Sequence, residues 1–318
     1  MQHTPYIGSG PYCYANSLAM MLGNDSPSPA VLEFATGSPF GMEIIGGKDP
    51  FFDPYGWDPV KGIDLALRAA GWDSTLQVGE DANDALENLR QALSGGSAAF
   101  VGPLDMGHLH YHPDSAHLSG ADHFLVVLGM TDDDKWVEVH DPHGFPYAKL
   151  PVQDLMQAWK AEGIAYGRPY MLRTNFRHIE HVSEEDVIRR SLGPAREWLS
   201  MEVHGMGEDA MPFGSVGNGT AARQLARMLE TNFTAGLRAH MVYFAVRVGV
   251  RRLADGSTCL ARVGYRDAAG VMGKQARLVG SLQYSLVQND VAAAVTTLEA
   301  LAETYQELER AMKAQSLF

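Results

Sequence analysis

The hydrophobic pattern near the start of the chain predicts a short amphipathic helix that begins at a cysteine. Four apolar residues recur at the spacing of one helical face: Ala15, Leu18, Ala19 and Leu22. Pro11 suits the first helical position, and Gly23 suits the end. Cys13 is then expected in the first turn, where the backbone N–H groups have no intrahelical partners and the helix dipole is positive.

The clearest β pattern is a hairpin in the middle of the chain. The nearly all-apolar run 123–129 and the alternating run 136–140 flank the Asp-rich turn 131–134, as expected for central strands of a sheet. Further strands are expected at 72–78, 98–101 and 170–174, and helices at 30–36, 60–70, 81–93 and 152–162. The Gly/Pro/aromatic segment 37–59 is expected to be a long loop, whose aromatic residues line a cleft or fill the core.

The pattern changes near residue 175. Helices are expected at 181–199, 220–231 and 287–315, whereas 240–253 and 258–264 suit either a strand or a buried helix. The predicted fold is therefore α+β, with one mixed domain over residues 1–175 and one mainly helical domain over residues 176–318.

Composition and charge limit the partners and the cellular location that are expected for the protein. The 318 residues carry a formal charge of −13, so neither nucleic acid nor an anionic membrane is an expected partner. The first residues lack the basic and apolar regions of a signal peptide, and no window is as apolar as a membrane span. With only two cysteines, Cys13 and Cys259, a cytoplasmic location is expected.

Cys13 has two interpretations. Cysteine is among the most buried residue types, so packing in the core is the first. The second is a nucleophile, because a helix N-terminus favours the thiolate and its unpaired N–H groups can hold an oxyanion.

The hairpin supplies the partners that a nucleophile needs. His123 begins its first strand and Asp141 ends its second. If the turn centres on 132–133, His123 faces Pro142, and a register that differs by one residue places it opposite Asp141. In either register the two side chains are neighbours. Cys13 as nucleophile, His123 as general base and acid and Asp141 as the orienting carboxylate would form a catalytic triad.

These motifs resemble those of papain-like cysteine enzymes of the double-glycine leader-peptidase type and, more closely, those of the butirosin-biosynthesis protein H family. The matching features are Cys13 at a helix start, Gly23 followed by Ser26, the loop 36–41, Asp105, the segment 111–113, His123 with Phe124, Asp141 with Pro142 and, less specifically, Phe213 with Gly214. The resemblance covers about the first 175 residues. It implies a papain-like domain with a central antiparallel sheet, followed by a mainly helical domain.

The family implies acyl transfer in natural-product biosynthesis. An acyl group would pass from the phosphopantetheine thioester of an acyl carrier protein to Cys13, and then to an amine of a small molecule. The candidate substrate-binding residues are Tyr12, Asn16, Asp105, Tyr111 and His112. No metal and no cofactor held by the chain itself is expected, and a homodimer is compatible with the sequence. The alternative on the same triad is a hydrolase, namely a peptidase, amidase or thioesterase.

Two positions depart from the family patterns. Tyr12 stands where the family often has a histidine before the cysteine, and Ile7 stands where the leader peptidases have a glutamine as oxyanion donor. Four residues are candidates to replace that donor: Gln2, Tyr6, Ser9 and Asn16. The sequence does not choose among them.

Two further groups of residues compete for a function. The alternation of His108, His110 and His112 would place three imidazoles on one face of a strand, where they could bind Zn or Ni in a non-enzymatic metal-binding module. The main basic groups are Arg189 with Arg190, and Arg247 with Arg251 and Arg252. They are either solvated faces or a docking surface for an acidic carrier protein.

Overall fold

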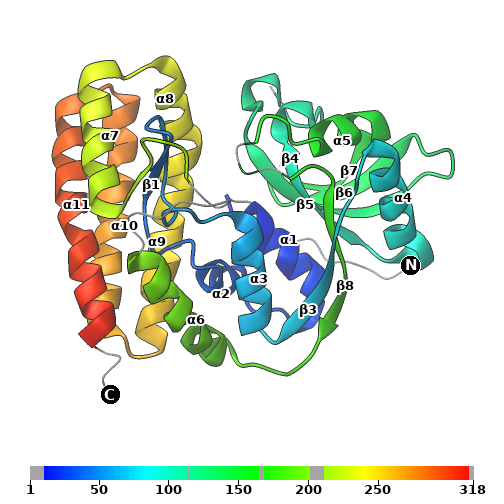
Figure 1. The fold of residues 1–318 in the computed structure, drawn as a ribbon, viewed down its shortest axis with the longest axis horizontal. Helices are drawn as coiled ribbons and strands as arrows, with labels where there is room; N and C mark the ends of the chain where they lie inside the picture. The colour runs from blue at the N-terminus through cyan, green and yellow to red at the C-terminus, as the bar shows by residue number, and fades with distance from the viewer. Residues whose placement is uncertain (1–10, 114, 165, 167, 201–210, 315–318) are drawn as a thin grey trace. The chain divides into compact units, whose positions relative to one another are not determined.

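The chain divides into two compact units (Figure 1). The computed structural model describes residues 11–113, 115–164, 166, 168–200 and 211–314. The first unit contains 71–181 and the N-terminal segment up to Pro29, and the second contains 30–70 and 182–318. The predicted division after residue 175 differs from this, because 30–70 joins the second unit and residue 175 lies inside a strand. The hydrophobic pattern reveals elements, but not the core that each of them joins.

A six-stranded antiparallel sheet forms the centre of the first unit, where the sequence predicts a central antiparallel sheet and five of these six strands. Its order is β3-β8-β4-β5-β6-β7, and every neighbouring pair is antiparallel. The strands are β3 (Trp72–Val78), β4 (Ala99–Asp105), β5 (Asp122–Met130), β6 (Trp136–Asp141), β7 (Phe145–Pro151) and β8 (Met171–His178). The helices of this unit are α1 (Cys13–Leu22), α4 (Ala82–Leu93) and α5 (Val152–Trp159).

Three of these strands differ from the prediction. β8 continues beyond the predicted 170–174 as far as His178. β4 continues beyond the predicted 98–101 as far as Asp105. β7 was not predicted, because its two prolines and a lysine make a poor strand pattern, and it lies at the edge of the sheet, where proline is tolerated. The differences in β4 and β7 matter for the site. β4 leads directly into the histidine-rich loop, and β7 pairs with β6, the strand that ends at Asp141.

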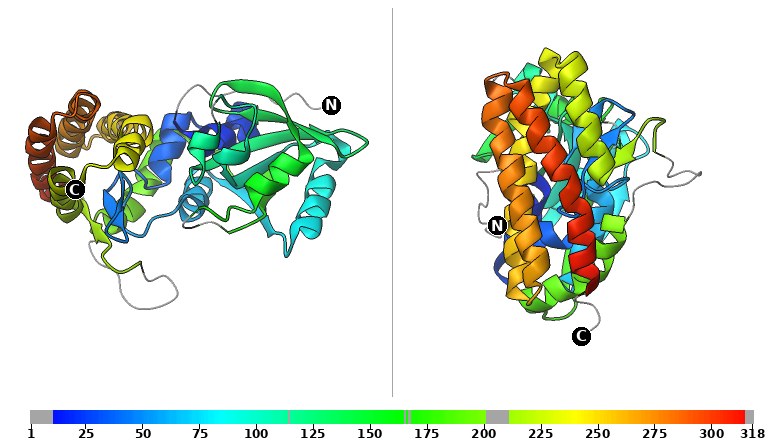
Figure 2. Two further views of the ribbon diagram at one scale, coloured as in Figure 1. Left: turned by 90° about the horizontal axis from the view of Figure 1, so that it is seen from above. Right: turned by 90° about the vertical axis from the view of Figure 1, so that its left-hand side faces the viewer.

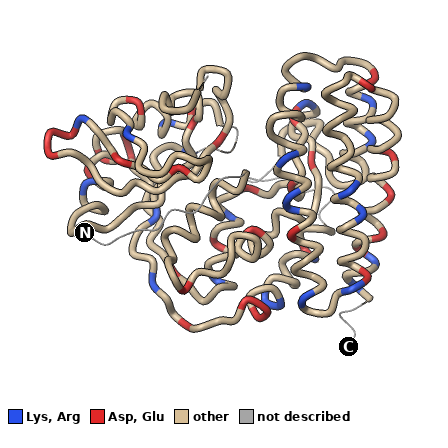
Figure 3. The backbone as a smooth tube through the Cα atoms, turned by 180° about the vertical axis from the view of Figure 1, so that it is seen from behind, with Lys and Arg blue, Asp and Glu red and all other residues tan. Residues whose placement is uncertain are grey.

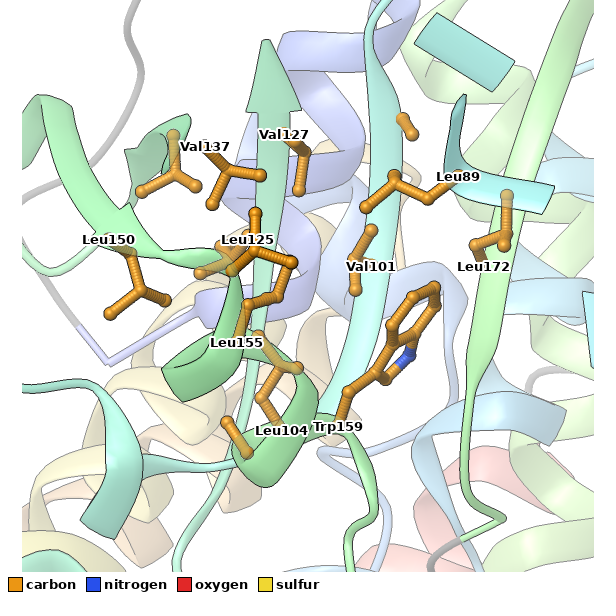
Figure 4. Packing of buried hydrophobic residues seen from close by; sticks show 14 of the residues in the cluster. Leu89, Val101, Leu104, Leu125, Val127, Val137, Leu150, Leu155, Trp159 and Leu172 are labelled. Atoms are coloured by element: carbon orange, nitrogen blue, oxygen red, sulfur yellow. The ribbon is translucent and has the colours of Figure 1, made fainter. Parts of the chain in front are cut away.

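The core of the first unit lies between the sheet and the helices α4 and α5 (Figure 4). Val101, Leu125 and Val137 project from three adjacent strands towards Leu155 and Trp159 of α5. The Trp159 indole donates a hydrogen bond to the Met171 carbonyl at 2.8 Å, so its N–H is satisfied although the ring is fully buried. Each such side chain contributes about 1.5–3 kcal/mol when removed from water, and together they fix the strands that carry the site.

The second unit is mainly helical, which confirms the predicted character of the C-terminal region. Its helices are α2 (Pro29–Ala35), α3 (Pro59–Ala69), α6 (Glu184–Ser200), α7 (Asn218–Asn232), α8 (Ala235–His240), α9 (Val246–Arg262), α10 (Arg266–Val287) and α11 (Val291–Ala314). α10 packs between α9 and α11, and α7 packs against α11 (Figure 2). A π-helical turn, Met241–Ala245, joins α8 to α9, so the ambiguous segments 240–253 and 258–264 are helical rather than strands.

The predicted loop 37–59 contains two short strands, β1 (Glu43–Ile45) and β2 (Asp49–Phe51). With β9 (Val216–Gly217) they form a three-stranded sheet in the order β2-β1-β9. Most aromatic side chains of this segment are buried, which favours the core interpretation over a cleft: Phe40, Phe52, Tyr55 and Trp57.

The basic residues that the sequence analysis singled out in the second unit differ in their surroundings. Arg252 is buried, and its guanidinium pairs with Glu33 at 2.7 Å and with Asp53. Arg251 pairs with Asp255, and Arg189 pairs with Asp186. Acidic and basic residues alternate along the helices of this unit (Figure 3). Within the described part of the chain, no helix is both long and apolar enough to cross a membrane.

Candidate active site

Helix α1 holds Cys13 at its first position. Tyr12 has non-helical backbone angles and caps the helix without a side-chain hydrogen bond, so Pro11 lies before the helix rather than inside it as the sequence suggested. The Ser17 hydroxyl donates to the Phe124 carbonyl at 3.1 Å, and the Tyr14 ring packs edge-on against the Phe124 ring. These contacts fasten α1 to β5, the strand that carries His123.

The β5–β6 hairpin brings His123 to Asp141 in a register that the sequence did not predict. Val126 pairs with His140, and a bulge follows between Val127 and Gly129. If this register is continued towards the start of β5, His123 lies opposite His143. Asp141 is then the diagonal neighbour of His123 on the same face of the sheet. His123 Nε2 donates to Asp141 Oδ1 at 2.9 Å. The predicted partnership is therefore present, through a diagonal pair rather than either register considered.

Asp141 is fully buried and accepts four hydrogen bonds. Its Oδ1 accepts from His123 Nε2 at 2.9 Å and from the His143 backbone N–H at 2.7 Å. Its Oδ2 accepts from His112 Nε2 at 2.6 Å and from the Tyr111 hydroxyl at 2.8 Å. Four donors occupy the four acceptor positions of a carboxylate, which compensates for its removal from water. Burial raises the pKa of Asp141, but His123 and His112 outweigh it and hold the pKa well below the ordinary range.

The pKa of His123 follows from this buried carboxylate. Burial by itself lowers the pKa of the imidazole, and the negative charge of Asp141 reverses this and raises the pKa to about 10. His123 is therefore an imidazolium at neutral pH. Because Nε2 is held by Asp141, Nδ1 is the nitrogen that faces away from the carboxylate, and Nδ1 is buried with no hydrogen-bond partner among the described residues.

Cys13 and His123 influence each other directly. The pKa of the Cys13 thiol is raised, because burial outweighs the imidazolium of His123 and the backbone N–H of Phe124, which both lower it. Cys13 in turn raises the pKa of His123. The thiol and the imidazole of His123 thus lie close enough to interact, while Nδ1 does not meet full hydrogen-bond geometry, as is common before a substrate binds.

The histidine-rich loop is organised by Asp105. Its Oδ1 accepts hydrogen bonds from the backbone N–H groups of Gly107 at 2.8 Å and Gly120 at 3.0 Å, one near each end of the loop. Asp105, a predicted substrate-binding residue, is 6% exposed, and these two hydrogen bonds make it an anchor of the loop. The loop then delivers Tyr111 and His112 to Asp141, and both residues donate hydrogen bonds to its carboxylate.

The alternative arrangement of His108, His110 and His112, with three imidazoles on one face of a strand, does not form. The segment folds as a 3₁₀ turn, Met106–His108, followed by a loop, so the three rings do not share the face of a strand. His110 instead contacts Asp154 at 2.8 Å, whereas His112 contacts Asp141. The imidazoles of His112 and His123 and the carboxylate of Asp141 do lie within 4.8 Å of one another, and their mutual hydrogen bonds account for that closeness.

Several other expected residues have a defined place. Tyr12 and Asn16 are both buried, at 1% and 2% exposure, next to Cys13 on α1. Gln2, Tyr6, Ile7 and Ser9 lie outside the described residues.

His143 was not among the predicted site residues. Residues two apart along a strand share a face, so the pairing of His123 with Asp141 could have pointed to His143 as well. The centres of the His143 and His123 rings lie 4.6 Å apart. A cavity of about 460 Å³ lies at the other end of α1, beside Met20 and Met21, and contains no member of the triad.

His112 gives a test of this arrangement. For the acyl transfer proposed below, we expect His112→Ala to lower the rate of Cys13 acylation about tenfold, because a hydrogen bond to a buried charge is lost. His112→Gln, which keeps an N–H donor of similar reach, should restore most of that rate. Steady-state kinetics should show the change in kcat. A change confined to KM would instead mean that His112 binds substrate directly.

Comparisons with known proteins place the chain in a family. Residues 212–313 match the family described as the YobF C-terminal domain. The chain is also 30% identical over 258 residues to the uncharacterized protein YobF of Bacillus subtilis (strain 168), and this match covers 79% of each chain. The similarity is longer than the C-terminal segment alone and so reaches into the rest of the chain. The chain therefore belongs to the YobF family.

Proposed function

We propose that this protein is a cysteine-dependent acyltransferase with a papain-like catalytic domain, related to the butirosin-biosynthesis protein H family. It would take an acyl group from a carrier-protein thioester and pass it through Cys13 to the amine of a small molecule. The observation that carries the proposal is the buried set of Cys13, His123 and Asp141, in which His123 Nε2 is held at 2.9 Å by the carboxylate and Nδ1 is left for the thiol. A cytoplasmic location, where Cys13 stays reduced, is part of the proposal.

The first half of the reaction uses His123 as an acid. The Cys13 thiolate, paired with the His123 imidazolium, attacks the thioester carbonyl carbon, so that a C–S bond forms and the π electrons move to oxygen. Collapse of this oxyanion breaks the C–S bond to the donor. The departing thiolate takes the proton of His123, leaving an acyl-enzyme and a neutral imidazole that Asp141 still orients.

The second half uses the same imidazole as a base. The amine attacks the acyl-enzyme carbonyl, its proton passes to His123, and Cys13 leaves as a thiolate. This restores the ion pair with Asp141 behind it. If water replaces the amine, the same steps give hydrolysis, so the hydrolase alternative shares every residue named here. A metal-binding function on His108, His110 and His112 has no comparable support, because His110 and His112 contact different carboxylates.

The direct test is covalent capture of the acyl group. We expect incubation with short-chain acyl thioesters of N-acetylcysteamine, which mimic the phosphopantetheine arm, to add one acyl mass that peptide mapping locates on Cys13. Cys259→Ala is the matched control, since Cys259 is 2% exposed and burial raises its pKa to about 12. That variant should be acylated like the wild type. Failure of every thioester in a panel to label Cys13 would contradict the proposal.

A second measurement separates transfer from hydrolysis. Once the acyl-enzyme has formed, the products are analysed with and without a primary amine. Transfer predicts that the amide increases with amine concentration at the expense of the free acid. A product that remains the free acid at all amine concentrations would support the hydrolase alternative.

A further inference from the structure

The proposed reaction creates a negative oxygen next to Cys13, and a pair of donors is needed to hold it. The Cys13 backbone N–H is one such donor, because the first N–H groups of a helix have no intrahelical partner and no side chain caps α1. The second donor is not fixed by the sequence, since Ile7 replaces the glutamine that the leader peptidases carry. The structure offers a candidate on α1 itself.

Asn16 is a buried polar residue with an unused donor. Its side chain is 2% exposed, and Nδ2 has no hydrogen-bond partner among the described residues. Nearly all buried polar groups in proteins are paired, and an unpaired one calls for an explanation such as a catalytic role. By contrast, the neighbouring Ser17 is also buried but donates to the Phe124 carbonyl. On this helix, the unpaired donor is therefore specific to Asn16 rather than general to its polar side chains.

Helix geometry directs Asn16 towards Cys13. The two residues are three apart, so they lie on the same side of α1. Side chains on a helix tilt towards its N-terminus and cover the preceding turn. The Asn16 amide thus covers the turn that carries the Cys13 sulfur and N–H. Both residues belong to one rigid element of ten residues, so their spacing does not depend on a loop.

We propose that the Asn16 side-chain amide is the second oxyanion donor, acting with the Cys13 backbone N–H; this rests on the proposed acyl transfer. When the Cys13 thiolate attacks the thioester carbon, the carbonyl π electrons move to oxygen. Asn16 Nδ2–H and Cys13 N–H donate to that oxygen without losing a proton. The electrons return when the donor thiolate leaves with the proton of His123, so Asn16 is unchanged at the end of the step.

The test compares two reactions of the same sulfur. Thioester acylation develops an oxyanion, whereas alkylation by iodoacetamide displaces iodide and does not. We expect Asn16→Leu to lower the acylation rate 10²–10³-fold, as loss of an oxyanion donor does elsewhere. The alkylation rate should stay within about threefold of wild type, because the thiol and His123 are untouched. The melting temperature should be unchanged or higher, since an unpaired buried amide is replaced by an apolar group of similar size.

Ser17→Ala is the matched control on the same helix. It removes a hydrogen bond that fastens α1 to β5, so any displacement of the helix should lower acylation and alkylation together. Equal acylation of Asn16→Leu and wild type would overturn the inference and leave the proposed function standing. Equal losses in acylation and alkylation would also overturn it, because Asn16 would then position the nucleophile. A wild-type protein that no thioester acylates would overturn the proposed function itself.

Discussion

Replacement of Cys13 by alanine is expected to abolish acyl transfer, with a loss of about 10⁶-fold in kcat. The sulfur forms the bond to the acyl group, and the only other cysteine is buried in the second unit with a pKa raised to about 12. Comparison of Cys13→Ala with Cys259→Ala, by product formation per minute, isolates the contribution of this sulfur. Activity of Cys13→Ala at the wild-type level on a substrate that the wild type turns over would refute the nucleophile assignment.

The same measurement of product formation, extended to variants of His123, should show that Cys13 and His123 serve the same catalytic steps. Loss of His123 removes the acid and base and leaves a buried thiol whose pKa burial raises. His123→Ala should therefore be nearly as inactive as Cys13→Ala, and the double variant should be no worse than either single variant. Multiplicative effects in the double variant would mean that the two residues serve separate steps.

Replacement of Asp141 by asparagine is expected to lower kcat by about 10⁴-fold. The Asp141 carboxylate accepts hydrogen bonds from four donors: Tyr111, His112, His123 and the His143 N–H. Asn has a single acceptor oxygen, so its NH₂ group would face one or more of these donors without being able to accept from them. Without the carboxylate, burial lowers the pKa of His123, so the imidazolium that favours the Cys13 thiolate is lost. Iodoacetamide alkylation of Cys13 at pH 8 should therefore also be slower in Asp141→Asn.

Asp141→Asn should also change how stability depends on pH. The pKa of His123 rises from 6.5 to about 10 in the folded chain, so the stabilisation is complete below pH 6.5 and is lost as the pH rises through 10. The pKa of Asp141 is lowered, so its contribution is present above pH 3.8 and is lost only as the pH falls through the folded value. Loss of the buried charge pair should destabilise the fold by about 3–5 kcal/mol at pH 7.

Urea unfolding between pH 6 and pH 10 checks this prediction. The wild type should lose stability across this range, and Asp141→Asn should show a flatter dependence. Asp133→Asn in the exposed turn of the same hairpin is the control and should follow the wild type, since its partners among the described residues, Thr131 and Lys135, are themselves exposed. If Asp141→Asn retained the wild-type slope, the ion pair would not be the source of the pH dependence.

Local patterns were sufficient for the elements that carry the triad. The apolar spacing after Cys13 predicted α1, and the apolar run after His123 predicted the β5–β6 hairpin, because both depend on residues close together in the chain. The register of the hairpin differs from both predicted registers, because the pairing beside the turn, Met130 with Val137, centres the turn one residue later than assumed, and a bulge between Val127 and Gly129 then shifts the pairing by one residue. A bulge is fixed by packing on both sides of a sheet rather than by the residues at the turn.

Contacts between distant segments decided the rest of the site. Nothing in the sequence near Asp141 shows that Tyr111 and His112 will bind its carboxylate, because Asp105 and two glycine N–H groups must first fold the loop. The same holds for residues 30–70, whose partner Arg252 in α9 is far along the chain. Buried polar groups find partners by three-dimensional proximity, which hydrophobic periodicity does not encode.

Residue patterns alone predicted an α+β fold, a helical C-terminal region, and a helix and two paired strands that carry Cys13, His123 and Asp141. The four donors to Asp141, the unpartnered Nδ1 of His123 and the unused amide of Asn16 emerged only from the folded chain. Secondary structure follows from interactions within a few residues, whereas the protonation and reactivity of a buried site depend on every charge and donor that packing brings to it.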